Sequence, residues 1–368
     1  MQSKDTAKTS SANFNEFEAI ETQQWQAAIE KFLKGKALES LDIKFEEDIR
    51  ISPILRANDD YLSLSNTGLP YPSSWSMCSY ILVGNQHTIE NINHSILDAL
   101  SRGSNALIIA VNKPLKSEEI LQLFKGVELA YIQVHFQLNL APSIQSDTLE
   151  HLARHFSGQA DRFSFDFNNV PQNSHLLETC QRLFGGCRPF CLQLSEASSD
   201  AMAQAFYTLS LYIDSCLEKG ETLEDILRSV RFEYPSTLDY FGSIAGMRAI
   251  RILWNGLLIA YNPSENIPCF IHCNVRMDST ENPYQNMIKA STQTMSAAVA
   301  GANSIWVEPS KGIENADDFS RRIALNIQHI LQSESYLNKI ADPAAGAFYI
   351  ESLTKKIADK AWQQFCSL

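Results

Sequence analysis

Two histidines spaced one helical turn apart are the first residues whose types and spacing could do chemistry. His151 and His155 stand at positions i and i+4 of residues 146–157, a segment whose pattern predicts a helix, so both imidazoles could reach one metal ion. A protein metal centre needs further ligands, and the sequence places none beside this pair. We therefore interpret the histidines as part of an exposed helix face, and we predict no metal ligand in the chain.

Eight cysteines are the other candidates for metal, redox or nucleophilic chemistry. None forms a C-x-x-C pair, and Cys187 with Cys191 and Cys269 with Cys273 lie inside apolar runs typical of strands. In a large chain, thiols in such runs are most often reduced and packed in the core. The sequence also lacks glycine-rich phosphate loops, a G-x-S-x-G turn and an H-E-x-x-H helix. We therefore assign no catalytic residue and no cofactor-binding residue.

Short apolar runs alternate with longer amphipathic segments from residue 76 onwards, which predicts alternating strands and helices. The run ALIIAV, residues 106–111, is apolar throughout, as in a parallel strand covered on both faces. Eight strand–helix units in about 260 residues match an eight-stranded parallel β/α (TIM) barrel better than an open doubly wound sheet. The predicted strands are 80–83, 106–111, 129–137, 162–167, 189–194, 230–234, 268–275 and 303–308, and the predicted helices are 89–100, 117–125, 146–157, 174–184, 199–218, 238–260, 284–300 and 317–335.

Polar side chains alternate with apolar ones along two of these strands. The outer face of a barrel strand packs on helices and is apolar, so the polar set is expected to face the lumen or its rim. Either a hydrogen-bonding ligand threads the lumen, or the polar groups satisfy one another and water, which is the more common case. The inward positions are Arg162, Ser164 and Asp166 in one strand and Phe270, His272 and Asn274 in the other.

An N-terminal arm, residues 1–75, is predicted to precede a barrel domain, residues 76–368. Residues 1–15 are polar and are expected to be disordered. Residues 22–36 carry apolar side chains at helical spacing and predict a helix. Residues 37–75 are rich in Asp, Asn, Ser and Pro, as in an extended segment without a core of its own.

Charge and hydropathy exclude several classes of protein. The chain of 368 residues has a formal net charge of −12, and an acidic surface repels phosphate backbones, so no nucleic-acid partner is expected. No run approaches the roughly 20 apolar residues of a membrane span, and the N-terminal residues lack the hydrophobic core of a secretory signal. We expect a cytoplasmic protein with no membrane partner.

Several segments resemble the methylmalonyl-CoA mutase family. The most specific is ADPAAGAFYIESLT, residues 341–354, which is similar to the motif that follows the family's last barrel helix. The resemblance covers most of residues 22–365. Further matches to the family's opening arm, barrel helices and eighth strand are residues 23–36, 196–210, 247–254, 281–309 and 317–343.

This resemblance implies a barrel whose lumen takes the pantetheine arm of an acyl-CoA, with adenosylcobalamin on a separate C-terminal domain over the barrel mouth. In the catalytic members the cofactor carries the radical chemistry, and the barrel positions and shields the reacting groups. The cobalamin domain contains a D-x-H-x-x-G loop. The only H-x-x-G here runs from His155 to Gly158 with Ala153 in place of the Asp, and the chain ends at Leu368. We therefore expect no cofactor in this chain.

The resemblance also implies that residues of the catalytic barrel are replaced. Gln193 stands where catalytic members have a histidine, and glutamine does not change charge near neutral pH. Val83, with Tyr80 nearby, stands where they have a tyrosine against the cobalamin, and Cys273-Asn274-Val275 stands in place of a Thr-Ser-Gly loop.

Heterodimeric mutases pair a catalytic large chain with a homologous small chain that has lost these residues, and this sequence resembles the small chain. The implied function is that of a non-catalytic subunit of the isomerase that interconverts methylmalonyl-CoA and succinyl-CoA, with adenosylcobalamin on the large subunit and the arm, residues 16–75, wrapped around it. Two alternatives stay open. The chain is an active acyl-CoA mutase barrel that uses a separately encoded cobalamin-binding chain, or a vestigial barrel that binds an acyl-CoA.

Overall fold

The structure is a computed structural model that describes residues 20–55, 71–167, 174–278 and 280–368. By its internal contacts the chain divides into two compact units, residues 1–55 and 56–368. The predicted disordered tail, residues 1–15, and residues 56–70 of the predicted extended segment lie outside the described residues.

The first unit contains one helix and a small hairpin. Helix α1, Thr22–Phe32, confirms the predicted helix but ends earlier, because Lys34 and Gly35 take positive φ angles of 57° and 83°. Its side chains are all exposed or half-buried. The 3₁₀ helix η1, Leu38–Leu41, leads into the antiparallel strands β1, Ile43–Lys44, and β2, Arg50–Ile51, which the sequence did not predict.

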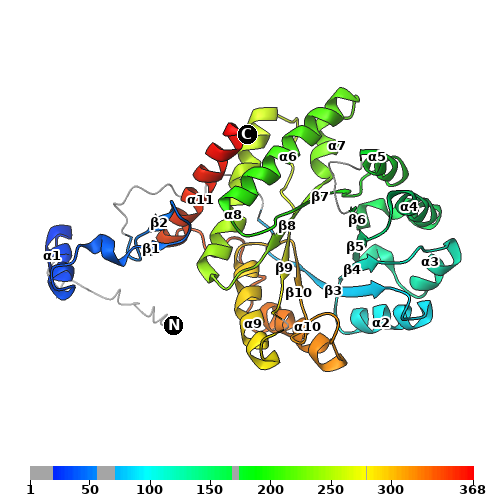
Figure 1. The fold of residues 1–368 in the computed structure, drawn as a ribbon, viewed down its shortest axis with the longest axis horizontal. Coiled ribbons are helices and arrows are strands. Elements are labelled where there is room, and N and C mark those ends of the chain that lie inside the picture. The colour runs from blue at the N-terminus through cyan, green and yellow to red at the C-terminus, as the bar shows by residue number, and fades with distance from the viewer. Residues whose placement is uncertain (1–19, 56–70, 168–173, 279) are drawn as a thin grey trace, which may run out of the picture. The chain divides into compact units, whose positions relative to one another are not determined.

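Eight parallel strands of the second unit form a nearly closed barrel surrounded by helices (Figure 1), which confirms the predicted fold class. Their order around the sheet is β6-β5-β4-β3-β10-β9-β8-β7. A single parallel bridge, between Ser164 and Arg188, joins the two end strands. The strands are β3 Ser76–Val83, β4 Ala106–Val111, β5 Gln133–Leu138, β6 Phe163–Asp166, β7 Phe190–Gln193, β8 Val230–Pro235, β9 Ile271–Val275 and β10 Ser304–Val307.

All eight predicted barrel helices are present. The third begins earlier than predicted, because Pro142 occupies the first helical turn, where its missing N–H costs nothing. The short α7 was not predicted. The helices are α2 Ile89–Ser101, α3 Ser117–Leu123, α4 Pro142–Phe156, α5 Ser174–Leu183, α6 Ser199–Glu218, α7 Leu223–Arg228, α8 Tyr240–Tyr261, α9 Pro283–Val299, α10 Asp318–Ser333 and α11 Phe348–Ser367, with 3₁₀ helices η3 Leu129–Tyr131 and η4 Ser157–Arg162.

The outward face of the strands forms an apolar layer under the helices. Phe136, Phe165 and Cys273 are fully buried there, and the rings of Phe136 and Phe165 stack with centroids 5.5 Å apart. Seven of the eight cysteines are buried and Cys366 is exposed, and all eight are free thiols. The inward face is therefore left to the alternate, more polar positions of the same strands.

Among the described helices, α8 has the largest number of buried residues. Helix α8 has the length and composition of a membrane span, although the sequence predicted none. Of its most apolar 18-residue stretch, 72% is buried inside the protein, as in a core helix. Helix α11 packs beside α8 and α6 (Figure 1). Arg248 of α8 pairs there with Glu351 of α11 at 2.9 Å and with Asp342 of the preceding loop.

Candidate functional site

The two histidines spaced at i and i+4 do not form a metal site. His151 bonds through Nδ1 to the Leu115 carbonyl at 2.9 Å, and His155 bonds through Nε2 to the Ser117 hydroxyl at 2.7 Å. Both side chains are half-buried, so the predicted exposed helix face is wrong. The histidines instead attach α4 to the segment that begins α3.

The predicted polar lumen exists, and four of the six predicted positions belong to it. Ser164 and Asp166 of β6 and His272 and Asn274 of β9 are buried inside the barrel. Arg162 lies at the end of η4 beside Asp161, 39% exposed, and Phe270 lies before β9 under the guanidinium of Arg188. The alternating pattern therefore begins two residues later in each strand than the sequence indicates, at Ser164 and at His272.

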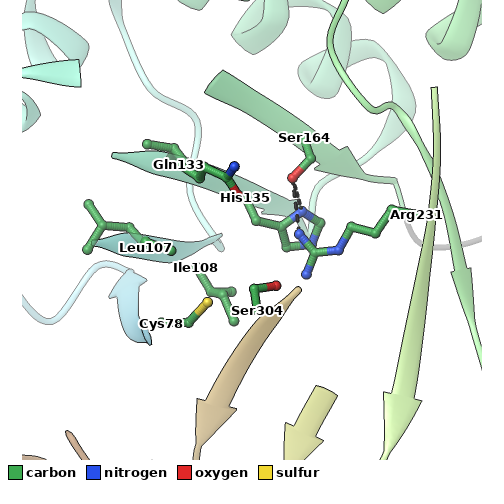
Figure 2. A pocket seen from close by; sticks show the side chains of 10 residues that line it. Cys78, Leu107, Ile108, Gln133, His135, Ser164, Arg231 and Ser304 are labelled. Carbon is green, nitrogen blue, oxygen red and sulfur yellow. Dashed lines mark hydrogen bonds between the residues drawn. The ribbon is translucent and has the colours of Figure 1, made fainter. Parts of the chain in front are cut away.

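One half of the polar network joins β5, β6 and β8 (Figure 2). His135 Nδ1 lies 2.9 Å from the Ser164 hydroxyl, which also accepts a hydrogen bond of 3.1 Å from Arg231. Arg231 donates a second hydrogen bond of 3.0 Å to Glu233 Oε1. The same carboxylate oxygen lies 3.3 Å from His135 Nε2. All four side chains are at least nine-tenths buried.

The other half of the network continues to β9 and β10. Asn274 donates to Glu233 Oε2 over 3.2 Å and its carbonyl oxygen lies 2.9 Å from His272 Nε2. His272 Nδ1 lies 2.7 Å from the Ser304 hydroxyl. Side chains of five strands thus form one connected polar layer across the lumen.

Burial and the Arg231 charge set the protonation of this layer. Burial by itself would raise the pKa of Glu233, but the charge of Arg231 and the nearby His135 imidazole hold that pKa well below its usual range. Burial, and then the repulsion of Arg231, lowers the pKa of His135 and lowers the pKa of His272 to about 3. Both histidines are therefore neutral at neutral pH, and Arg231 with Glu233 is the charged pair.

Little space remains in the lumen. A cavity of about 20 Å³, lined by residues that include Cys78, His135 and Arg231, has room for about one water molecule. On β3 and β10 the rings of Tyr80 and Trp306 lie 5.3 Å apart and pack on the small apolar side chains of β4. Around this cavity, the described side chains of the polar layer and the Tyr80 and Trp306 rings occupy the lumen.

The positions that replace the family's catalytic residues lie near the carboxyl ends of the strands. Gln193 ends β7 with an exposed side chain whose amide is 3.4 Å from Glu233 Oε2. Val83 is fully buried on the outward face of β3, whereas Tyr80 faces inward against Trp306. Of the segment Cys273–Val275, only Asn274 joins the lumen network.

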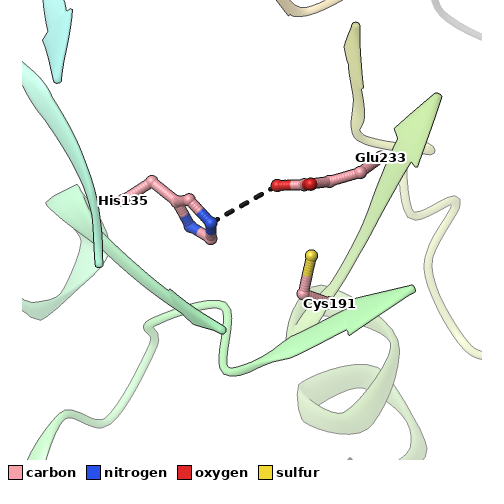
Figure 3. A group of neighbouring side chains, drawn as sticks. All are labelled: His135, Cys191 and Glu233. Atoms are coloured by element: carbon pink, nitrogen blue, oxygen red, sulfur yellow. Dashed lines mark ion pairs between the residues drawn. The ribbon is translucent and has the colours of Figure 1, made fainter. Parts of the chain in front are cut away.

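Three side chains of the polar layer have the chemistry of metal ligands (Figure 3). The ligand atoms of His135, Cys191 and Glu233 lie within 4.8 Å of one another, and all three residues are buried. The sequence analysis missed this group, because each residue stands on a different strand. The polar alternation in QVHFQL, residues 133–138, was the signal that could have found His135.

Comparison with known proteins agrees with the sequence motifs. The family model described as methylmalonyl-CoA mutase matches residues 192–368. The methylmalonyl-CoA mutase small subunit of Porphyromonas gingivalis is 27% identical over 98% of this chain and 65% of that protein. The corresponding protein of Propionibacterium freudenreichii is 34% identical over 45% of this chain and 26% of that protein.

The probable methylmalonyl-CoA mutase small subunit of Mycobacterium tuberculosis is 27% identical over 74% of this chain and 49% of that protein. The chain thus spans about two thirds of the first of these relatives and half or less of the other two. A dihydropteroate synthase from Yersinia pestis has a TM-score of 0.45 at 11% identity, over 72% of this chain and 95% of that chain, which bears on no function. From the family model and the small-subunit relatives, residues 192–368 of this chain belong to the methylmalonyl-CoA mutase family.

Proposed function

We propose that this chain is the small, non-catalytic subunit of a heterodimeric, adenosylcobalamin-dependent methylmalonyl-CoA mutase, and that it supports a catalytic large subunit. The observation that carries this proposal is the filled lumen. Its polar layer is nine-tenths buried and closed by an ion pair of 3.0 Å between Arg231 and Glu233. A barrel in this state has no channel for an acyl-CoA arm.

Opening such a channel would be costly. A ligand threading the barrel would have to separate the Arg231–Glu233 pair or displace the Trp306 and Tyr80 rings. Removing one partner of a buried ion pair costs about 3–5 kcal/mol, which the binding of a pantetheine arm would first have to supply. A supporting role needs no such opening, because it uses the outer surface of the protein.

The described residues do not fit adenosylcobalamin. The H-x-x-G histidine, His155, is already bonded to Ser117, and its neighbour Ala153 is buried inside α4. The cofactor supplies radical chemistry in this family, and we propose that the large subunit holds it. The present chain takes no step in that chemistry in our proposal.

The first unit is the segment best suited to reach a partner. The side chain of Phe32, at the end of α1, is 87% exposed, and Ile20 is 67% exposed. Large apolar side chains displayed on an arm without a core are typical of an interaction segment. We propose that this arm contacts the large subunit and that the complex resides in the cytoplasm.

Co-expression with the catalytic large subunit from the same source, followed by size-exclusion chromatography with light scattering, tests the subunit role. We expect a 1:1 complex. Replacing Phe32 by Ser should weaken the complex, whereas the matched control Tyr131→Ser, 81% exposed on η3, should leave it unchanged. Two separate peaks from the unaltered chains would contradict the proposal.

Calorimetric titration of the isolated chain with methylmalonyl-CoA and with CoA separates this function from the acyl-CoA-binding alternatives. The filled lumen predicts no heat of binding at millimolar ligand. Saturable binding that is abolished by a substitution in the lumen would instead show that the barrel opens. The chain would then have a binding function besides the supporting role.

A further inference from the structure

We propose that the barrel lumen holds one divalent transition-metal ion of the zinc class, ligated by His135 Nε2, Cys191 Sγ and the Glu233 carboxylate. The three residues come from β5, β7 and β8, and their ligand atoms lie close together although the residues are far apart in sequence. Figure 3 shows the imidazole, the thiol and the carboxylate pointing toward one common point.

The donor atoms suit this class of ion. Zinc binds imidazole nitrogen, thiolate sulfur and carboxylate oxygen at about 2.0–2.3 Å, often with three protein ligands and one open position. Two such ligands on one tetrahedral ion lie about 3.3–3.8 Å apart. The observed atoms lie within 4.8 Å of one another, so the side chains would move closer together by up to about 1 Å on binding.

His135 is prepared for this role by its second nitrogen. Nδ1 is 2.9 Å from the Ser164 hydroxyl, the kind of outer partner that orients a ligating imidazole. Nε2 is buried, faces Glu233 at 3.3 Å, and has no hydrogen bond of good geometry. A metal ion between Nε2 and the carboxylate would satisfy both.

The charges of the layer balance a divalent cation. Arg231 lies 3.0 Å from the Glu233 carboxylate, and its positive charge repels a second cation. Three negative charges offset this repulsion, those of Glu233, of the nearby Asp166 and of Cys191 in its thiolate form. Their sum with Arg231 is two net negative charges, which one divalent ion neutralises.

Binding must displace the thiol proton. Burial, and then the charges of Glu233 and Asp166, raises the pKa of Cys191 well above its ordinary value. The free site therefore holds a neutral thiol, and metal binding releases one proton as the sulfur–metal bond forms. Gln193, at the end of β7, has an exposed side chain that also contacts Glu233, so it lies between this carboxylate and solvent.

A cobalt titration of the full chain tests the site. The exposed Cys366 is first replaced by Ser, which removes the surface thiol. After chelator treatment, we expect one Co²⁺ to bind, with a thiolate-to-cobalt charge-transfer band and release of one proton, and Zn²⁺ to displace it. A titration of this protein without a thiolate band would overturn the proposal.

Variants assign the ligands. Cys191→Ser should abolish the band, and His135→Gln should weaken Zn²⁺ affinity more than about tenfold. The control Cys273→Ser removes an equally buried thiol that faces the helices and should leave both unchanged. Ser164→Ala keeps all three ligands and should weaken affinity about 10–100-fold by freeing the imidazole. A band that survives Cys191→Ser would contradict the assignment, even if other variants fold poorly.

Discussion

The guanidinium of Arg248 and the carboxylate of Glu351 lie 2.9 Å apart, both withdrawn from solvent, although 103 positions separate them in the chain. Glu351 also accepts a hydrogen bond of 3.0 Å from the Gly346 backbone N–H. The pair thus ties α8, α11 and the ADPAAG turn together. This contact gives the family's most specific motif a structural role in closing the barrel's helical layer.

Glu351→Gln should therefore destabilise the protein strongly. It removes one of the two acidic partners of the buried Arg248 and leaves Asp342, so the loss should approach but not exceed the about 3–5 kcal/mol of a fully broken buried pair. Urea denaturation gives the free energy of unfolding. The control Asp359→Asn removes an exposed ion pair with Lys355 on the same helix and should cost less than about 1 kcal/mol. Equal losses in the two variants would show that the buried pair has no special weight.

Arg231→Met should destabilise the barrel for a related reason. It leaves the buried Glu233 carboxylate without its cation, at a cost of about 3–5 kcal/mol. The double variant Arg231→Met/Glu233→Gln should recover part of this loss, because the uncompensated charge is removed. A double-mutant cycle on the metal-free protein measures the coupling free energy between the two side chains. Strictly additive losses would mean that the two side chains do not interact.

Gly256→Ala should also destabilise the protein, against the usual preference of helices for alanine. A Cβ at Gly256 of α8 would lie 2.9 Å from the Trp362 ring of α11. Overpacking costs about 1–3 kcal/mol, which offsets the gain of about 0.5–1 kcal/mol from removing a helical glycine. Gly185→Ala meets nothing within 4 Å and serves as the control. Thermal unfolding should show a lower midpoint for Gly256→Ala alone.

Stability should fall on the alkaline side. Burial raises the pKa of Tyr71, Cys269 and Cys273 to about 12 each. These groups ionise more easily in the unfolded chain, at about 8.5–10, so their contribution is complete below that range and is lost as the pH rises toward about 12.

Urea denaturation at a series of pH values measures this loss. Tyr71→Phe keeps the ring that lies 5.0 Å from the Arg251 guanidinium carbon but removes the ionisable hydroxyl. The variant should lose less stability between neutral and alkaline pH than the unaltered chain. Parallel curves for the two proteins would show that folding does not raise the pKa of the Tyr71 hydroxyl.

The sequence predicts the barrel well because its strands are short and buried on both faces. Ala106–Val111 is wholly apolar and coincides with β4, and Ser164, Asp166, His272 and Asn274 were correctly expected in the lumen. The two-residue strands β1 and β2 are too short to produce a pattern.

The convergence of His135, Cys191 and Glu233 could not be predicted in the same way. Each residue looks ordinary within its own strand, and only the pairing of neighbouring strands brings the three side chains together. Cys191 pairs with Arg231, and Glu233 pairs with Gln193, two residues further along β7. Strand register depends on the closed sheet, which local sequence does not encode.

The pairing of β3 with β10 also bears on how the chain acquires its structure. Ser76, in the first barrel strand, pairs with Ser304, in the last barrel strand. During synthesis, β3 therefore lacks one neighbour until the residues of β10 have left the ribosome. Contacts of such long sequence separation slow folding, and unpaired strand edges expose nascent chains to aggregation. Chaperone dependence during translation is the physiological consequence to look for.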